Sequence, residues 1–217
     1  MSKIRVKVCG ITSFRDLSIA VEAGVDAVGF IVGVPESPRN LSMEEAEKLI
    51  SRTPVFVETV VVSVPSNLKR LEEICRKLNP HSVQVHGLNH LDGRFRKLSH
   101  QTRLIGAVNV KPGLKVDEVV RDSDVFDAVL LDSHLPGRYG GTGRTHDWDF
   151  SRQVRDAIYP KPLILAGGLT ADNVEEAIRS VRPYAVDVSS GVESKPGVKD
   201  QKKVLEFVRK VRRVEEL

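Results

Sequence analysis

Cysteine and aromatic residues are scarce in this 217-residue sequence, and each scarcity excludes a class of protein. Two cysteines, Cys9 and Cys75, cannot build the disulfide framework of a small secreted domain. Aromatic residues make up 5% of the chain, and they do not interleave with basic residues as in many nucleic-acid-binding surfaces. The histidines, among them His86, His134 and His146, lack the spacing of zinc ligands, so the sequence predicts no metal site.

Long apolar segments are also missing. No run approaches the roughly 18 residues that a membrane-spanning helix needs. The first ten residues, MSKIRVKVCG, lack the apolar core and the small-residue cleavage site of a signal peptide. We therefore expect a cytoplasmic protein without a membrane partner.

The overall composition is that of a globular protein, with 41% hydrophobic residues, 29% charged residues and a net charge of +4. The length fits one domain, which we place at residues 1–217. The densest basic run, residues 199–213, carries apolar residues at helical spacing, namely Val204, Phe207, Val208 and Val211. This spacing favours a solvated helix face over a nucleic-acid site. A small phosphorylated substrate would explain the positive charge equally well.

Short apolar segments alternate with amphipathic segments along the chain. The apolar segments that predict strands are residues 4–9, 27–32, 55–63, 82–86, 104–110, 128–132, 162–166 and 185–188. Helical patterns follow these segments. Ser42 and Glu45 have capping-box spacing, and Asp147 should cap a helix that opens at Trp148. The helical pattern around residues 91–98 is weak. Eight strand–helix units predict an α/β fold, a single closed (β/α)8 or TIM barrel, with a doubly wound open sheet as the alternative.

Reactive and small residues stand where the predicted strands end. The active site of a (β/α)8 barrel lies at the carboxyl ends of its strands. The candidate site residues at these ends are Cys9, Arg39 in the loop after the second strand, Ser63, His86, Asp132, Gly167, Gly168, Ser189, Ser190 and Gly191.

Glycine and serine turns follow the last two strands, at residues 167–168 and 189–191. Backbone N–H groups and serine hydroxyls in such turns can bind a phosphate. Glycine can also serve only to shape a turn, but two such turns at one barrel end favour a phosphate site. Another glycine-rich loop, residues 137–143, follows Asp132 and would let bare backbone approach a ligand.

Cys9 and Asp132 are the candidate reactive pair. A free cysteine is most often a small buried hydrophobe, which suits Cys75 on a helical stripe. Cys9 instead ends a strand, where a thiolate near a cationic mouth could act as a base or nucleophile. Asp132 could supply acid chemistry or merely cap a loop, and for His86 a structural role and a ligand role remain equally open.

Seven motifs resemble those of phosphoribosylanthranilate isomerase of tryptophan biosynthesis. They are KVCGIT (7–12), the loop ending in Arg39, QVHG (84–87), LLDS (130–133), GGTGRTHDW (140–148), LAGGL (165–169) and AVDVSSGVE (185–193). They extend over nearly the whole chain. Cysteine after the first strand together with aspartate after the sixth is specific, whereas the glycine and serine turns occur in many phosphate-binding barrels.

The resemblance implies an Amadori rearrangement of an aminoaldose to an aminoketose, without a cofactor. It implies that Asp132 is the general acid, that the Cys9 thiolate is the general base, and that Arg39 meets the anthranilate carboxylate. The implied substrate-binding residues are His86, Gly141, Gly143, Gly167, Gly168, Ser189, Ser190 and Gly191, with the phosphate against the last two turns. These roles would require a raised pKa for Asp132 and a lowered pKa for Cys9.

The chain also departs from the family pattern. Many members carry an aromatic residue shortly after the position of Phe30, where this chain continues with Ile31, and the Arg39 loop contains Pro35 and Pro38.

Three rival functions stay open. The first is the sister isomerase of the histidine pathway, which uses aspartate at the position of Cys9. The second is indole-glycerol-phosphate synthase, which relies on a strand lysine. The third is a barrel that binds a sugar phosphate without turnover. We expect a monomer or a homodimer, and we expect Asp187 to be a barrel-core carboxylate paired with a neighbour.

Overall fold

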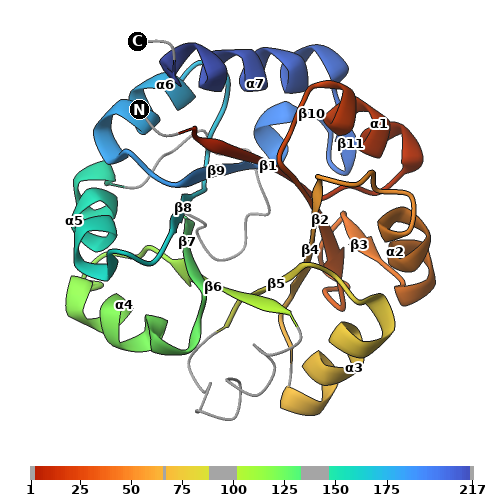
Figure 1. The fold of residues 1–217 in the computed structure, drawn as a ribbon, viewed down its shortest axis with the longest axis horizontal. Helices are drawn as coiled ribbons and strands as arrows, with labels where there is room; N and C mark the ends of the chain where they lie inside the picture. Colours follow the sequence, from red (N-terminus) through yellow and green to blue (C-terminus); the bar gives the residue numbers. More distant parts are fainter. Residues whose placement is uncertain (1–2, 66, 88–101, 133–146, 216–217) are drawn as a thin grey trace.

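Parallel strands close into a barrel in the computed structural model of the chain (Figure 1), which describes residues 3–65, 67–87, 102–132 and 147–215. The eight barrel strands are β1 (Arg5–Cys9), β2 (Ala27–Val32), β4 (Glu58–Ser63), β5 (Ser82–Val85), β6 (Arg103–Asn109), β7 (Ala128–Asp132), β8 (Leu163–Leu165) and β9 (Ala185–Val188). Strand β1 pairs in parallel with both β2 and β9, which closes the sheet. The predicted (β/α)8 barrel is therefore confirmed, and the open-sheet alternative is wrong.

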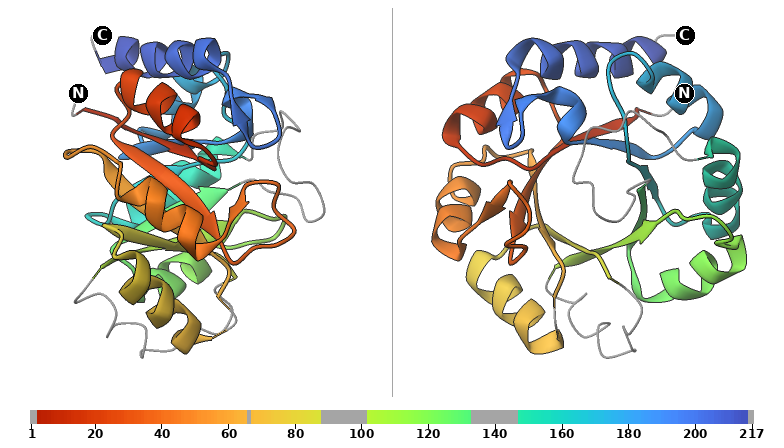
Figure 2. Two further views of the ribbon diagram at one scale, coloured as in Figure 1. Left: turned by 90° about the vertical axis from the view of Figure 1, so that its right-hand side faces the viewer. Right: turned by 180° about the vertical axis from the view of Figure 1, so that it is seen from behind.

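Helices surround the barrel on its outside (Figures 1 and 2). They are α1 (Phe14–Glu22), α2 (Met43–Ile50), α3 (Leu68–Leu78), α4 (Val116–Asp122), α5 (Trp148–Ile158), α6 (Val174–Val181) and α7 (Gln201–Glu215). Short elements decorate the loops: β3 (Asn40–Leu41) pairs with β2, β10 (Glu193–Lys195) pairs with β11 (Val198–Lys199), and η2 (Ser123–Val125) and η3 (Ser190–Val192) are 3₁₀ turns.

The predicted helix caps are confirmed. Ser42 Oγ accepts a hydrogen bond from the backbone N–H of Glu45, while Glu45 Oε2 accepts one from the N–H of Ser42. This reciprocal capping box starts α2. Asp147 Oδ1 accepts from the N–H of Asp149 at 2.8 Å and caps α5, which opens at Trp148 as predicted.

The strand predicted over residues 55–63 begins later than its apolar pattern suggests. Glu58 is its first paired residue, opposite Ala27, because the neighbouring strand β2 starts there. Val55 and Phe56 precede the pairing and are 82% and 99% exposed. The helical pattern around residues 91–98 lies outside the described residues.

The apolar core lies on both sides of the sheet. Outward-facing residues such as Val8, Phe30 and Leu131 are fully buried beneath the helices. The inward-facing set fills the barrel and consists of Cys9, Val60, Val62, Ile105, Ala107, Leu130, Ile164, Ala166 and Ala185. Strands buried on both faces explain the nearly continuous apolar runs in the sequence.

Asp26, in the turn before β2, ties the two ends of the chain together. Its carboxylate accepts hydrogen bonds from Lys3 at 2.7 Å, from the backbone N–H of Val6 at 2.9 Å and from Arg212 of α7 at 2.8 Å. Partial burial opposes ionisation, but the hydrogen bonds from Lys3, Arg212 and Val6 outweigh it and lower the pKa of Asp26 from 3.8 to about 2.

This lowered pKa predicts an acid-sensitive component of stability. A carboxyl group with a depressed pKa in the folded state stabilises the fold above its unfolded pKa, and the contribution is lost as the pH falls through the folded value. We expect Asp26→Asn to lower the free energy of unfolding at neutral pH by roughly 1–2 kcal/mol. The variant should also lose part of the fall in stability that the wild type shows between about pH 4 and pH 2. Urea unfolding over a pH series measures both effects.

Asp156→Asn provides the matched control, because Asp156 pairs with Arg155 at a site where its side chain is 64% exposed. Exposed pairs contribute little to stability. If the two variants show the same acid profile, Asp26 does not contribute in this way.

Candidate active site

Cys9 and Asp132 end two strands of the same barrel. Cys9 is the last residue of β1, and Asp132 is the last residue of β7. Cys9 belongs to the inward-facing cluster and is 6% exposed. Asp132 follows inward-facing Leu130 by two residues, so the strand pleat places it on the inner face as well. The carboxyl ends of parallel strands share one rim, and the fold therefore brings both residues to that rim.

Polar side chains lie inside the barrel one pleat below Cys9. Lys7 Nζ is 3.0 Å from Asp187 Oδ2 and donates to Gln84 Oε1 at 3.0 Å. Gln84 Nε2 lies 2.9 Å from His86 Nε2. Asp187 is therefore a barrel-core carboxylate paired with a neighbour, as predicted. His86 has a structural hydrogen bond, and its contact with substrate remains a prediction.

The pKa of Cys9 differs from the expectation. Burial raises the pKa of the thiol, the Lys7 ammonium opposes this rise, the Asp187 carboxylate adds to it, and the Lys199 ammonium opposes it. The net result is a pKa above the ordinary value, so the expected lowering is wrong for this structure. Burial also disfavours the charge of Lys7, but Asp187 and Cys9 outweigh that effect and raise the pKa of Lys7.

The turn after β8 has the backbone conformation that its glycines suggest. Gly167 and Gly168 have φ values of +84° and +63°, which side chains with a β-carbon rarely adopt. Asn173 fixes the turn from both sides: its Nδ2 donates to Gly168 O, and its Oδ1 accepts from the N–H of Thr170, each at 2.9 Å. No motif or spacing in the sequence singles out Asn173.

The turn after β9 packs against the turn after β8. It contains η3, in which the N–H of Val192 donates to Ser189 O at 3.3 Å. A β-carbon on Gly191 would overlap the carbonyl oxygen of Leu169. Glycine at position 191 therefore allows the two candidate phosphate turns to touch.

Arg39 lies beside the first and last strands at the rim. Its Nε and Nη2 donate to the two carboxylate oxygens of Glu193 at 2.7 and 2.6 Å. A β-carbon placed on Gly10 would lie 2.5 Å from Arg39 Cδ and 3.1 Å from Ser189 Oγ. Arg39 is thus next to the Cys9–Gly10 turn, and two of its guanidinium nitrogens already bind the carboxylate of Glu193. Nη1 makes no hydrogen bond to any residue that the structure describes.

A second buried cation completes this ion-pair group. Lys199 Nζ donates to Glu193 Oε1 at 2.9 Å and to Ser189 O at 3.2 Å, with its side chain 0% exposed. Burial lowers the pKa of Lys199, although the Glu193 carboxylate opposes that effect.

Sequence reasoning missed Glu193 and Lys199, because a short hairpin after the last strand has no periodic pattern. Lys7 was also missed, although a lone charge two residues before Cys9 in an apolar strand was a usable signal.

Two predicted substrate-binding residues, Gly141 and Gly143, lie outside the described residues, as do His134 and His146. Among the residues that are described, no group of three histidine, cysteine, aspartate or glutamate side chains could hold a metal ion. No helix in the described segments is long and apolar enough to cross a membrane.

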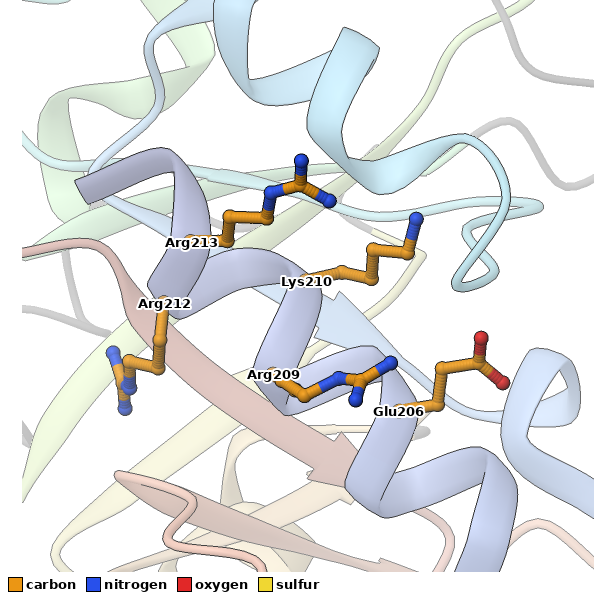
Figure 3. Close-up of a pocket in the computed structure, with 5 residues that line it drawn as sticks. All are labelled: Glu206, Arg209, Lys210, Arg212 and Arg213. Carbon is orange, nitrogen blue, oxygen red and sulfur yellow. The ribbon is translucent and has the colours of Figure 1, made fainter. Parts of the chain in front are cut away.

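A surface hollow of about 530 Å³ lies away from the predicted site residues. It is lined by side chains of α7, which are Glu206, Arg209, Lys210, Arg212 and Arg213 (Figure 3). The apolar residues of this helix, including Val204, Phe207, Val208 and Val211, are buried. From Gln201 onward the basic run is therefore the polar face of an amphipathic helix, as predicted, whereas Lys199 lies on β11 and is buried, so the prediction is wrong for that residue.

Comparisons with known proteins agree with the barrel fold and show the family. Residues 6–210 match the family model for N-(5'-phosphoribosyl)anthranilate (PRA) isomerase. The chain is 43% identical over 226 residues to N-(5'-phosphoribosyl)anthranilate isomerase 1 of Methanosarcina mazei, covering 97% of this chain and 95% of the relative. The crystal structure of phosphoribosyl anthranilate isomerase from Thermotoga maritima superposes with a TM-score of 0.86 and 37% identity, covering 96% of this chain and 98% of that one. A phosphoribosyl anthranilate isomerase in complex with reduced 1-(o-carboxyphenylamino)-1-deoxyribulose 5-phosphate superposes with a TM-score of 0.82 and 35% identity, over 96% and 98% of the chains.

Together the barrel, its rim and these relatives define an enzyme, an isomerase that interconverts an aldose and a ketose. The chain belongs to the N-(5'-phosphoribosyl)anthranilate isomerase family.

Proposed function

We propose that the chain converts N-(5-phosphoribosyl)anthranilate to 1-(2-carboxyphenylamino)-1-deoxyribulose 5-phosphate in tryptophan biosynthesis, with Asp132 as general acid and Cys9 as general base. One observation carries these roles: in a member of this family, Cys9 and Asp132 end β1 and β7 at the same barrel rim. We infer that residues 1–217 form one cytoplasmic domain, acting as a monomer or homodimer on a small phosphorylated substrate.

The first step is the opening of the ribose ring. Asp132, in its protonated form, gives its proton to the ring oxygen as the bond from that oxygen to C1 breaks. The lone pair of the anthranilate nitrogen forms a double bond to C1, which yields a protonated Schiff base. A general acid placed to donate during bond breaking contributes about 10²- to 10⁴-fold to the rate.

The second step is the transfer of the C2 proton. The Cys9 thiolate takes this proton, the C–H electrons form a double bond between C1 and C2, and the nitrogen recovers its lone pair. The resulting enaminol then gains a proton at C1 and loses one from the C2 hydroxyl to become the ketone. The atoms of the product equal those of the substrate, and the substrate nitrogen accepts the electrons, so no cofactor enters the reaction.

Arg39 and the two glycine turns would hold the ends of the substrate. Arg39 keeps Nη1 available, as far as the described residues show, for the anthranilate carboxylate. The phosphate would lie against the turns after β8 and β9, at Gly167, Gly168, Ser189, Ser190 and Gly191. The contact between these turns supports a shared phosphate site, and the first N–H groups of a helical turn such as η3 have no acceptor within the turn. His86, Gly141 and Gly143 complete the proposed substrate-binding set.

Gly191→Ala tests the phosphate site. The added β-carbon would overlap Leu169 O and force the two turns apart. We expect KM to rise roughly tenfold or more with kcat much less affected, since one hydrogen bond to a charged group contributes about 1.5–3 kcal/mol. Steady-state kinetics and calorimetric titration with inorganic phosphate measure the effect. Gly113→Ala is the control for a glycine-to-alanine change without overlap, because its β-carbon would meet nothing within 4 Å; its φ of +85° adds backbone strain that Gly191→Ala does not impose. An equal KM in the two variants would contradict the phosphate site.

The experiment that tests the function is an isomerase assay with purified protein. Phosphoribosylanthranilate is supplied and its fluorescence is followed, and the histidine-pathway aminoaldose is offered in a parallel reaction. We expect turnover of the anthranilate compound and a much lower kcat/KM for its competitor. Turnover of the histidine-pathway compound alone would assign the sister reaction. Binding of reduced product without turnover of either substrate would leave a sugar-phosphate-binding barrel.

A further inference from the structure

Lys7 is a buried cation that the proposed reaction does not use. It lies on β1, two residues before Cys9, and is 3% exposed. An ammonium group in a protein interior is unfavourable unless it is paired, and an apolar side chain of similar volume would fill the same space more stably. Its presence at the base of the site therefore calls for a chemical explanation.

The geometry directs Lys7 toward Cys9. Cys9 Sγ and Lys7 Cε lie 2.8 and 3.2 Å from the point where a β-carbon of Gly29 would stand. Gly29 pairs with Cys9 across β1 and β2. The missing side chain at position 29 thus provides the space in which the thiol and the lysine come together.

Asp187 and Gln84 hold the ammonium in this place. Lys7 Nζ has Asp187 Oδ2 on one side and Gln84 Oε1 on the other, each at 3.0 Å. Asp187 Oδ1 is buried and has no hydrogen-bond partner among the residues that the structure describes. Within the described part of the chain, Asp187 therefore contacts Lys7 through Oδ2 alone.

The charges around Cys9 come from several elements. Lys7 lies on its own strand, Asp187 on β9, and Lys199 on β11. The rim adds Asp132 on β7, the Arg39–Glu193 pair, and His86 beyond Gln84. Of the cations that favour the thiolate, Lys7 has the largest effect, and Asp187 offsets part of it.

We propose that Lys7 is a positioning residue whose ammonium group, held by Asp187 and Gln84, stabilises the thiolate of Cys9 inside the barrel. This inference rests on the proposed function, in which that thiolate is the base. Burial in the apolar barrel favours the neutral thiol, and Lys7 supplies the opposing charge from its place two residues before Cys9 on β1.

The test measures ionisation of Cys9 directly. In a Cys75→Ala background, the ultraviolet absorbance of the thiolate is followed against pH, with Cys9→Ser subtracted as the blank. The compared proteins carry Lys7→Met, Lys7→Arg or the natural lysine. Lys7→Met alone leaves the buried carboxylate of Asp187 without its cation, which could prevent folding. A double variant, Lys7→Met with Asp187→Asn, removes that carboxylate as well.

We expect Lys7→Met to raise the titration midpoint of Cys9 by about one to three pH units, or beyond the accessible range. The double variant should raise it less, because Asp187 acts in the opposite direction, and Lys7→Arg should stay closest to the wild type. The ascending limb of the kcat/KM pH profile should shift with the midpoint, with about a tenfold loss at neutral pH for each unit. A purely structural lysine would lower thermal stability without moving either midpoint.

An unchanged thiolate midpoint in the lysine variants overturns the inference, whatever their activity. The proposed function fails differently: full turnover by Cys9→Ser would remove Cys9 as the base, while the absorbance titration would still report whether Lys7 stabilises its thiolate.

Discussion

Asp132→Asn is expected to lower kcat/KM for phosphoribosylanthranilate by about 10²- to 10⁴-fold. The amide has nearly the shape of the carboxylic acid but cannot give a proton to the ring oxygen, so the ring-opening step loses its catalyst. Because the substitution adds no volume at the end of β7, the substrate should still bind. Stopped-flow fluorescence gives the rate, and titration with reduced 1-(o-carboxyphenylamino)-1-deoxyribulose 5-phosphate gives the affinity.

Asp124→Asn is the control for the loss of one negative charge, because Asp124 is exposed and lies in η2, just before the same strand. It should keep the wild-type rate. Retention of wild-type kcat/KM by Asp132→Asn would remove Asp132 as the acid. A loss of rate accompanied by an equal loss of affinity for the reduced product would instead assign it to substrate binding.

Cys9→Ser is expected to cause a loss of similar size, about 10²- to 10⁴-fold in kcat/KM. A serine hydroxyl occupies nearly the same space but ionises far less readily than a thiol, so proton removal from C2 becomes slow. Ring opening should persist, because Asp132 is unchanged. Solvent-deuterium incorporation at the ketose, together with the rate, reports on the proton-transfer step.

Cys75→Ser separates the chemistry of Cys9 from the general effect of replacing a thiol. Cys75 is 6% exposed on α3, away from the rim, and burial raises its pKa to about 11. Its replacement should change stability without changing kcat/KM. Cys9→Asp should retain more turnover than Cys9→Ser, because a carboxylate near Lys7 can be ionised at neutral pH. Equal activity of wild type and Cys9→Ser would be incompatible with a thiolate base.

The barrel could be predicted because the eight apolar segments alternate with amphipathic helical segments. Parallel pairing of strands that are separated by helices leads to the same (β/α)8 arrangement. The β7 and β9 boundaries, residues 128–132 and 185–188, coincide with the apolar segments that predict them. The strand that begins at Glu58 was predicted three residues too early, because the apolar run at Val55 and Phe56 extends beyond the start of its partner strand. Strand ends depend on the neighbouring strand, and a sequence pattern alone does not contain that information.

The site could be predicted only in part. Cys9 and Asp132 were recognisable because each ends an apolar strand. The Arg39–Glu193 pair joins residues 154 positions apart, and Lys199 reaches the same carboxylate from a hairpin. Such contacts depend on how loops from opposite ends of the chain fold over the rim. The direction of the Cys9 pKa was wrong because a predicted positive mouth says nothing about the depth at which the thiol is buried.

The closure of the barrel through β1 has a consequence for biosynthesis on the ribosome. Cys9 and Lys7 on β1 are synthesised long before Asp187, which holds Lys7 and belongs to the last barrel strand. A nascent chain that ends before β9 can contain both the proposed base, Cys9, and the proposed acid, Asp132, and still lack Asp187. Activity should therefore appear late, when the final strand pairs with the first, and a fragment that ends before β9 should not turn over the substrate.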